Sequence, residues 1–232
     1  MQIDKEVLDF LKTQKKVTIG FSTGKDSLAC AILLKNHNID FIPFFFYQIP
    51  DLEFVEKNIQ LYEKELNMNI IRVPHPMLYD WLRHQDFQYP KSIDFLEDKG
   101  YIKSSFEDMI NLYLYSVGDE NEYYDIVGMR ANESFNRRMI LRDKGAIRHD
   151  IKKIYPIHNW AMKDVNEYII ENKYSFTDDY KVWNRSFDGL KYQFLFGVKK
   201  NYPKDWQTIL EYFPLIELEL FRYEKNIEYF TK

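Results

Sequence analysis

The sequence predicts an α/β fold: a Rossmann-like, doubly wound and mostly parallel sheet with a mixed helical C-terminal extension. In the first half of the chain, apolar runs of strand length alternate with segments of helical periodicity. This pattern is typical of parallel sheets covered by helices on both faces. After Tyr174 the pattern loosens into helical segments interrupted at Pro214. We therefore expect residues 1–172 to form the α/β domain and residues 173–232 to form an extension packed on it.

Each element follows from local composition, taken in chain order. Asp4 is placed to cap a short helix with one apolar face, which ends at Lys15 and Lys16. The run FIPFFFY is apolar throughout, as in a strand buried on both faces. The stretch from His75 to about residue 102 holds several prolines and aromatic residues, so we expect it to be less regular. The expected strands are residues 17–21, 41–47, 70–73 and 124–128, and the expected helices are residues 28–35, 52–66, 106–117 and a segment that includes Asp164 and Ile169.

Composition excludes several classes of protein. Hydrophobic residues make up 45% of the 232 residues, which excludes general disorder, and a net charge of -4 argues against wholesale coating of nucleic acid. The single cysteine, Cys30, lies in an apolar helical segment and is expected to be an inert core thiol. It leaves no disulfide, dithiol pair or cysteine-built metal cage. With no apolar stretch near the roughly 20 residues of a membrane span, we expect a cytoplasmic protein with no membrane partner, no iron–sulfur cluster and no zinc.

The turn between the first strand and its helix is unusually polar. Ligands of open parallel sheets gather at the carboxyl ends of strands, and a helix N-terminus offers free N–H groups to an anion. Gly24 lets the backbone approach a phosphate, Lys25 adds positive charge, and Asp26 is suited to cap the helix or to hold magnesium against phosphates. Capping and turn chemistry alone is the plainer alternative. The candidate phosphate-binding residues are Ser22, Thr23, Gly24, Lys25, Asp26 and Ser27.

The order Ser-x-Gly-x-Asp-Ser after a first strand resembles the pyrophosphate-binding loop of the adenine nucleotide α-hydrolase-like (PP-loop) superfamily. The usual motif is Ser-Gly-Gly-x-Asp-Ser, so Thr23 departs from it, as residues in the sulfurylase branch do. The turn is not a Walker A loop, because Gly20 lies too close to Gly24 and an aspartate follows the lysine. The resemblance implies ATP or phosphoadenylyl sulfate (PAPS) as the nucleotide and Mg²⁺ as its metal, with Asp26 as the metal ligand.

A second segment, IVGMRANESFNRR, resembles the Gly-x-Arg-x-x-Glu-Ser-x-x-Arg segment of the PAPS reductase-like family. The resemblance places Gly128 in the nucleotide site. It also implies that Arg130 and Arg137 contact the nucleotide's phosphates or the anion of a second substrate, and that Glu133 and Ser134 orient them. Arginine suits this role because its planar guanidinium binds phosphate through two hydrogen bonds. Glu–Arg pairs on a solvated helix face are the alternative.

A third segment, YPIHNWAMKDVNEYI, resembles the Pro-x-x-x-Trp-x-x-x-Asp-Val-x-x-Tyr-Ile segment of the same family. We interpret it as structural: Trp160 packs in the core, and Asp164 caps a helix or contacts its first turn. The fold implies that adenine lies against the end of the second strand. Tyr47 is the expected contact there, with Gln48 and Asp51 close by, although the Asp-Thr or His-Thr-Gly usual after this strand is missing.

The C-terminal part departs from the reductases of this family, which carry a nucleophilic cysteine on a C-terminal tail. Residues 185–220 resemble a tail of some phage and bacterial relatives that has a Gly-Cys-x-x-Cys-x-x-x-Gly core. Gly189 and Gly197 remain in this chain, whereas Leu190 and Gln193 replace the two cysteines. Without a thiol there is no nucleophile for sulfonucleotide reduction.

The resemblance and the missing thiol together favour phosphorus chemistry. The enzyme would cleave ATP between its α- and β-phosphates and adenylylate an unidentified acceptor, with Lys25, Asp26, Arg130 and Arg137 as the catalytic residues. Two alternatives stay open: a non-catalytic module or subunit that binds an adenine nucleotide, and a PAPS enzyme whose thiol comes from a partner chain. A tRNA or DNA acceptor, a partner subunit and a homo-oligomer are also left open by the sequence.

Overall fold

A six-stranded sheet lies at the centre of the protein, whose computed structural model describes residues 3–89 and 104–230. The strand order is β3-β2-β1-β4-β6-β5, and all neighbours pair in parallel except the edge strand β5, which is antiparallel to β6. The order reverses at β1, which pairs with β2 on one side and with β4 on the other. The predicted mostly parallel, doubly wound sheet is thus confirmed. The strands are β1 (Val17–Gly20), β2 (Phe41–Tyr47), β3 (Ile71–Pro74), β4 (Asp125–Ile126), β5 (Ile147–Arg148) and β6 (Lys153–Ile154).

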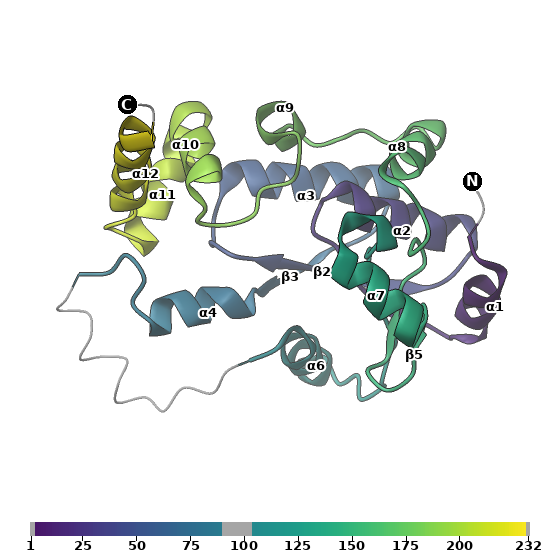
Figure 1. Ribbon diagram of the computed structural model, residues 1–232. Coiled ribbons are helices and arrows are strands. Elements are labelled where there is room, and N and C mark those ends of the chain that lie inside the picture. Colours follow the sequence, from purple (N-terminus) through teal and green to yellow (C-terminus); the bar gives the residue numbers. More distant parts are fainter. Residues whose placement is uncertain (1–2, 90–103, 231–232) are drawn as a thin grey trace.

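Helices cover both faces of this sheet (Figure 1). α2 and α3 lie on one face, where Ile19, Phe21 and Leu28 belong to a large buried cluster, and α6 covers the other face, where Phe44 packs on Ile110. The apolar run of β2 supplies both cores, because side chains alternate between the faces of a strand. Within the described residues, no helix combines the length and the apolar character that a membrane span requires. The helices are α1 (Lys5–Thr13), α2 (Lys25–Asn36), α3 (Glu53–Leu66), α4 (Pro76–Arg83), α6 (Phe106–Ser116), α7 (Phe135–Lys144), α8 (Met162–Glu171), α9 (Asp179–Trp183), α10 (Tyr192–Asn201), α11 (Pro203–Tyr212) and α12 (Glu217–Phe230), with a 3-10 turn at Ala131–Glu133.

The structure differs most from the prediction at the start of α2 and in the stretch that follows β3. α2 begins at Lys25, earlier than expected, because Gly24 already takes the extended conformation of a helix N-cap. α4 falls in the stretch expected to be irregular: its first residue is a proline, which suits that position, and the Nδ1 atom of His75 accepts a hydrogen bond from the N–H of Met77 at 2.9 Å. The rest of that stretch, residues 90–102, lies outside the described residues.

The C-terminal helices α10, α11 and α12 pack on one another and against the beginning of α3 (Figure 1). The carboxylate of Asp205 on α11 is buried and accepts hydrogen bonds from the backbone N–H groups of Glu53 at 2.5 Å and Phe54 at 3.4 Å. It thereby caps α3, whose own N-cap residue, Leu52, has no side chain able to do so. The C-terminal extension therefore packs against α3, the helix that follows β2. The domain boundary at residue 172 stays a prediction.

Candidate functional site

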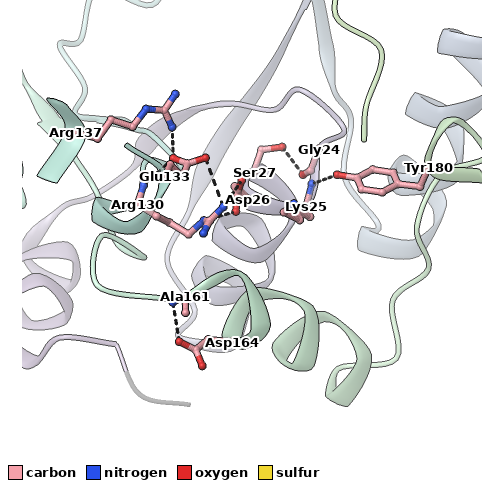
Figure 2. A network of polar contacts seen from close by, with 10 residues as sticks. All are labelled: Gly24, Lys25, Asp26, Ser27, Arg130, Glu133, Arg137, Ala161, Asp164 and Tyr180. Atoms are coloured by element: carbon pink, nitrogen blue, oxygen red, sulfur yellow. Dashed lines mark hydrogen bonds and ion pairs between the residues drawn. The ribbon is translucent and has the colours of Figure 1, made fainter. Parts of the chain in front are cut away.

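The 22–27 turn lies at the carboxyl end of β1, where the strand order reverses. At such a switch point the connections after neighbouring strands leave toward opposite faces of the sheet and open a crevice between them. Figure 2 shows α2, which begins within the turn, facing Arg130 and Glu133 on one side and Tyr180 on the other. The topology thus brings together the turn, the segment that follows β4 and the segment that contains Tyr180.

Hydrogen bonds within the 22–27 turn fix its shape. The hydroxyl of Ser27 donates to the carbonyl of Gly24 at 2.9 Å, and the N–H of Gly24 donates to Ser22 Oγ at 3.4 Å. Thr23 between them is buried and has a φ of 57°, in the left-handed region. Because Gly24 is the N-cap, the first-turn amides of α2 have no preceding helical carbonyl to pair with. The turn therefore presents N–H donors at a helix N-terminus, which suits an anion.

Gly128, in the connection after β4, lies directly against the start of α2. A Cβ atom at this position would lie 2.9 Å from the carbonyl carbon of Asp26 and 3.0 Å from its oxygen. Only glycine fits at this separation. Gly128 therefore sets how closely the segment carrying Arg130 approaches the turn.

Asp26 and Arg130 form the central ion pair of the site (Figure 2). The Nε atom of Arg130 donates to Asp26 Oδ1 at 2.7 Å, and its Nη2 atom lies 3.4 Å from Glu133 Oε1. Glu133 also pairs with Arg137 one turn further on. The Arg130 side chain is only 3% exposed, so its charge is enclosed between the two carboxylates. This places Arg130 in a position to hold Asp26, while its expected contact with phosphate stays a prediction.

The Asp26 carboxyl lies partly inside the protein and partly in a cavity. Burial raises the pKa of Asp26 above its ordinary value, and the hydrogen bond from Arg130 acts in the opposite direction. No cluster of three or more potential metal ligands occurs among the described residues. A magnesium ion that enters with phosphates needs only one or two carboxylates. Asp26 fits that requirement, since its Oδ2 atom makes only a long contact of 3.5 Å with Arg130.

A cavity of about 550 Å³ opens beside the turn. We call it the turn cavity; it is lined by turn residues including Gly24 and Lys25, by Asp26 and Arg130, and by residues of the 180–186 segment. The turn is therefore not filled by neighbouring side chains and has room for an anion. Ser134 and Arg137 lie outside its lining: Ser134 caps α7 by accepting from the N–H of Arg137 at 3.2 Å.

A second cavity, also of about 550 Å³, adjoins the first. We call it the deep cleft; it follows the carboxyl ends of β1, β2 and β4 and is lined by residues including Tyr47, Asp125 and Gly128. The two cavities share Ser22, Arg185 and Ser186. Tyr47 thus lies where the sequence expected an adenine contact, and its carbonyl accepts from the N–H of His75 at 2.9 Å.

The 180–186 segment supplies cavity-lining residues that were not predicted from the sequence. The hydroxyl of Tyr180 accepts a hydrogen bond from the N–H of Lys25 at 2.7 Å, and burial raises the pKa of Tyr180 to about 12. Arg185 and Ser186 follow on the same segment and line both cavities. No motif spacing connects this segment with the turn, because only the folded chain brings them together.

In the third family-like segment, Trp160 and Asp164 make structural contacts, whereas Met162 lines the turn cavity. Trp160 is buried at 2% exposure in the core beside α2. Asp164 accepts a hydrogen bond from the N–H of Ala161 at 2.7 Å, which is the first-turn contact that the sequence predicted for α8. Trp160 and Asp164 place α8 and do not line either cavity.

Cys30 and Leu190, one of the two residues that replace the tail cysteines, are also structural, whereas Gln193 is exposed. Cys30 is fully buried, and burial raises the pKa of its thiol, so no reactive thiolate forms there. Leu190, at the position of a tail cysteine, is buried in the C-terminal core. Gly189 has a φ of 73°, and a Cβ there would lie 2.5 Å from Gln48 Oε1, which accounts for the retained glycine.

Comparison with known proteins gives a sequence match and several structural likenesses. A search of curated proteins found no match. Among solved structures, the chain is similar to phosphoadenylyl-sulfate (PAPS) reductase from Candida auris in a phosphate complex (13% identity, TM-score 0.48, covering 78% of this chain and 89% of that chain). It is also similar to the NH3-dependent NAD synthetase from Campylobacter jejuni (14% identity, TM-score 0.45, 94% and 92%) and to the U34-tRNA thiolase NcsA from Methanococcus maripaludis (14% identity, TM-score 0.43, 92% and 78%).

The sequence match assigns the family. Residues 16–181 match the profile of the family described as the phosphoadenosine phosphosulfate reductase domain. The matched range contains the 22–27 turn, the Asp26–Arg130 pair and α8, and it ends before Arg185. Because the match covers more than half of the chain, this protein belongs to the phosphoadenosine phosphosulfate reductase domain family.

Proposed function

We propose that this protein is a PP-loop enzyme that binds ATP and transfers its adenylyl group to an acceptor, with release of pyrophosphate. One observation carries the proposal: the turn cavity and the deep cleft are joined at the switch point of the sheet. A nucleoside in the deep cleft would extend its phosphates past Ser22 toward the amides of α2. A ligand with an apolar base and a polyanionic end suits this pair of cavities.

The proposed chemistry is substitution at the α-phosphorus. An acceptor oxygen forms a bond to this phosphorus, the bond to the bridging α–β oxygen breaks, and pyrophosphate leaves. Lys25 and the first-turn amides of α2 would stabilise the negative charge that develops on the leaving group. Arg130 would act by holding Asp26 in place, since its guanidinium already pairs with that carboxylate.

Magnesium would be held by Asp26 together with the phosphates of the nucleotide. When bound, the ion neutralises charge on the phosphates and orients the leaving pyrophosphate. Glu133 pairs with both Arg130 and Arg137 and would help to hold Arg130 in place. The role of the turn is thus to position the substrate and to supply charge.

PAPS is the alternative nucleotide, in keeping with the family. Cys30 is the one cysteine of the chain and is buried in α2, so a reductase reaction would need the thiol of a partner chain. Tighter binding of PAPS than of ATP would favour this alternative. Binding of ATP without turnover would favour a non-catalytic module.

Pyrophosphate release tests the proposal. Purified protein incubated with ATP and Mg²⁺, with and without total tRNA as an acceptor, should release pyrophosphate above a protein-free control. Asp26→Asn keeps the shape of the side chain but loses its charge, so release should fall by at least about tenfold. Asp143→Asn is the matched control, because Asp143 is exposed and pairs with the adjacent Arg142 outside the lining of both cavities. ATP binding without any release of pyrophosphate would contradict the proposed reaction.

A further inference from the structure

The cations of the turn cavity are unequally available to a ligand. Its lining contains the carboxylates of Asp26 and Glu133 and the cations of Lys25, Arg130 and Arg185. Arg130 is enclosed by the two carboxylates and only 3% exposed. A polyphosphate brings several negative charges that need cationic partners when they leave water. Among the described lining residues, Lys25 and Arg185 are the cations that remain for it.

The segment 179–188 is held firmly against the turn. Asp179 is 1% exposed, and its carboxylate accepts from the N–H of Phe187 at 3.0 Å, which joins the two ends of the segment. Tyr180 reaches across the cavity and accepts from the N–H of Lys25, the first residue of α2, at 2.7 Å. Because the Tyr180 hydroxyl uses a lone pair for this contact, its own proton is free to be donated elsewhere. The 179–188 segment therefore forms a fixed wall of the turn cavity, opposite the turn.

Arg185 lies where the two cavities meet. It lines both of them, as does Ser186, whose hydroxyl oxygen would lie 3.1 Å from a Cβ atom placed on Gly24. The Arg185 side chain is 56% exposed, and its guanidinium is 3.7 Å from Asp188 and 5.6 Å from the ring centre of Phe194. An exposed ion pair of this length is weak, so a phosphate would compete with it readily.

We propose, building on the function proposed above, that the 179–188 segment is the second wall of a polyphosphate site and that Arg185 supplies its charged contact. Arg185 then contacts the phosphates beyond the α-position, which lie in the turn cavity opposite the amides of α2. The site selects nucleotides that carry phosphate beyond the α-position over a nucleoside monophosphate. The family match ends at residue 181, so Arg185 lies outside the matched range.

Calorimetric titration with ATP, AMP and inorganic pyrophosphate tests this assignment. Arg185→Ala should weaken the binding of ATP and of pyrophosphate by about tenfold or more, because each ligand loses a charge-assisted contact. The affinity for AMP should change by less than about threefold. Arg185→Lys keeps the charge but not the planar fork, so its affinity for ATP should lie between those of the wild type and Arg185→Ala.

Arg222→Ala is the matched control, since Arg222 is an exposed arginine on α12 that pairs with Glu219. It removes the same charge and should leave all three affinities unchanged. ATP affinity within twofold of the wild type in Arg185→Ala, or equal losses for ATP and AMP, would overturn the assignment. A wild-type protein that binds none of the three ligands would instead contradict the proposed function itself.

Discussion

Thr23 holds a backbone conformation that favours glycine. Its φ of 57° lies in the left-handed region, where a β-branched residue is strained by an amount of order 1–3 kcal/mol. The usual motif of the superfamily has glycine at this position. The one departure from the motif therefore coincides with a strained residue inside the candidate site.

The strain at Thr23 predicts an unusual order of stability for two variants of this residue. Thr23→Gly and Thr23→Ala both lose the buried hydroxyl and methyl groups, but only glycine relieves the left-handed strain. We expect Thr23→Gly to unfold with a free energy about 1 kcal/mol higher than Thr23→Ala, measured by urea denaturation. At ordinary positions the order is the reverse, because glycine gains more entropy on unfolding. Greater stability of Thr23→Ala would therefore contradict the strained geometry.

Individual site residues were easier to predict than their partners. Asp26 and Arg130 were both identified from short motifs, yet their ion pair was not predicted. They are 104 residues apart, and only the parallel pairing of β1 with β4 brings their two connections together. A motif gives the residue type that the chemistry needs, whereas the contact depends on sheet topology.

At the scale of secondary-structure elements, β4 places a carboxyl group on the wall of the deep cleft. Asp125 on β4 is opposite Lys153 on β6, and its Oδ1 atom accepts from the hydroxyl of Thr18 on β1 at 3.1 Å. Lys153 in turn pairs with Glu107 on α6 at 2.6 Å. Burial raises the pKa of Asp125 to about 7, and the charge of Lys153 only partly counters this. The short β4 strand therefore carries a buried carboxyl that titrates near neutral pH.

Asp125 predicts a pH dependence of stability. In the unfolded chain its pKa is close to 3.9, so between about pH 4 and pH 7 the folded protein binds the extra proton. The stability contributed by protonated Asp125 is therefore lost as the pH rises through this window. Asp125→Asn keeps an acceptor for Thr18 and removes the titration, so its stability relative to the wild type should rise by about 2.5 kcal/mol from pH 5 to pH 8. The measurement is the free energy of unfolding in urea. If the difference between Asp125→Asn and the wild type is the same at pH 5 and at pH 8, the raised pKa of Asp125 is contradicted.

The long elements were predicted most accurately, and β4 is the one two-residue strand of the described sheet that was predicted. β2 and α3 match their predicted ranges almost residue for residue, because each shows several repeats of its apolar period. β5 and β6 have two residues each, too few for any period to be visible, and the antiparallel pair was not predicted. α4 was missed because its proline suggested a break, whereas proline is well suited to the first position of a helix.

At the scale of the whole molecule, the C-terminal segment completes the site. Tyr180 and Lys25 are 155 residues apart, and their hydrogen bond spans the α/β domain and the segment that leads into the extension. The capping of α3 by Asp205 fixes the extension from its other side. Sequence patterns predicted that helices follow residue 173, but they contain no information on which surface those helices cover. The placement comes from buried contacts between distant residues, which local periodicity does not encode.

The central claim is that the 22–27 turn binds the phosphates of an adenine nucleotide. A crystal structure of the protein with a non-hydrolysable ATP analogue and Mg²⁺ tests it most directly. The account predicts density for the terminal phosphates in the turn cavity, against the amides of Asp26 and Ser27 in the first turn of α2, with the base in the deep cleft. An analogue bound elsewhere, with the turn cavity filled by water alone, would contradict it.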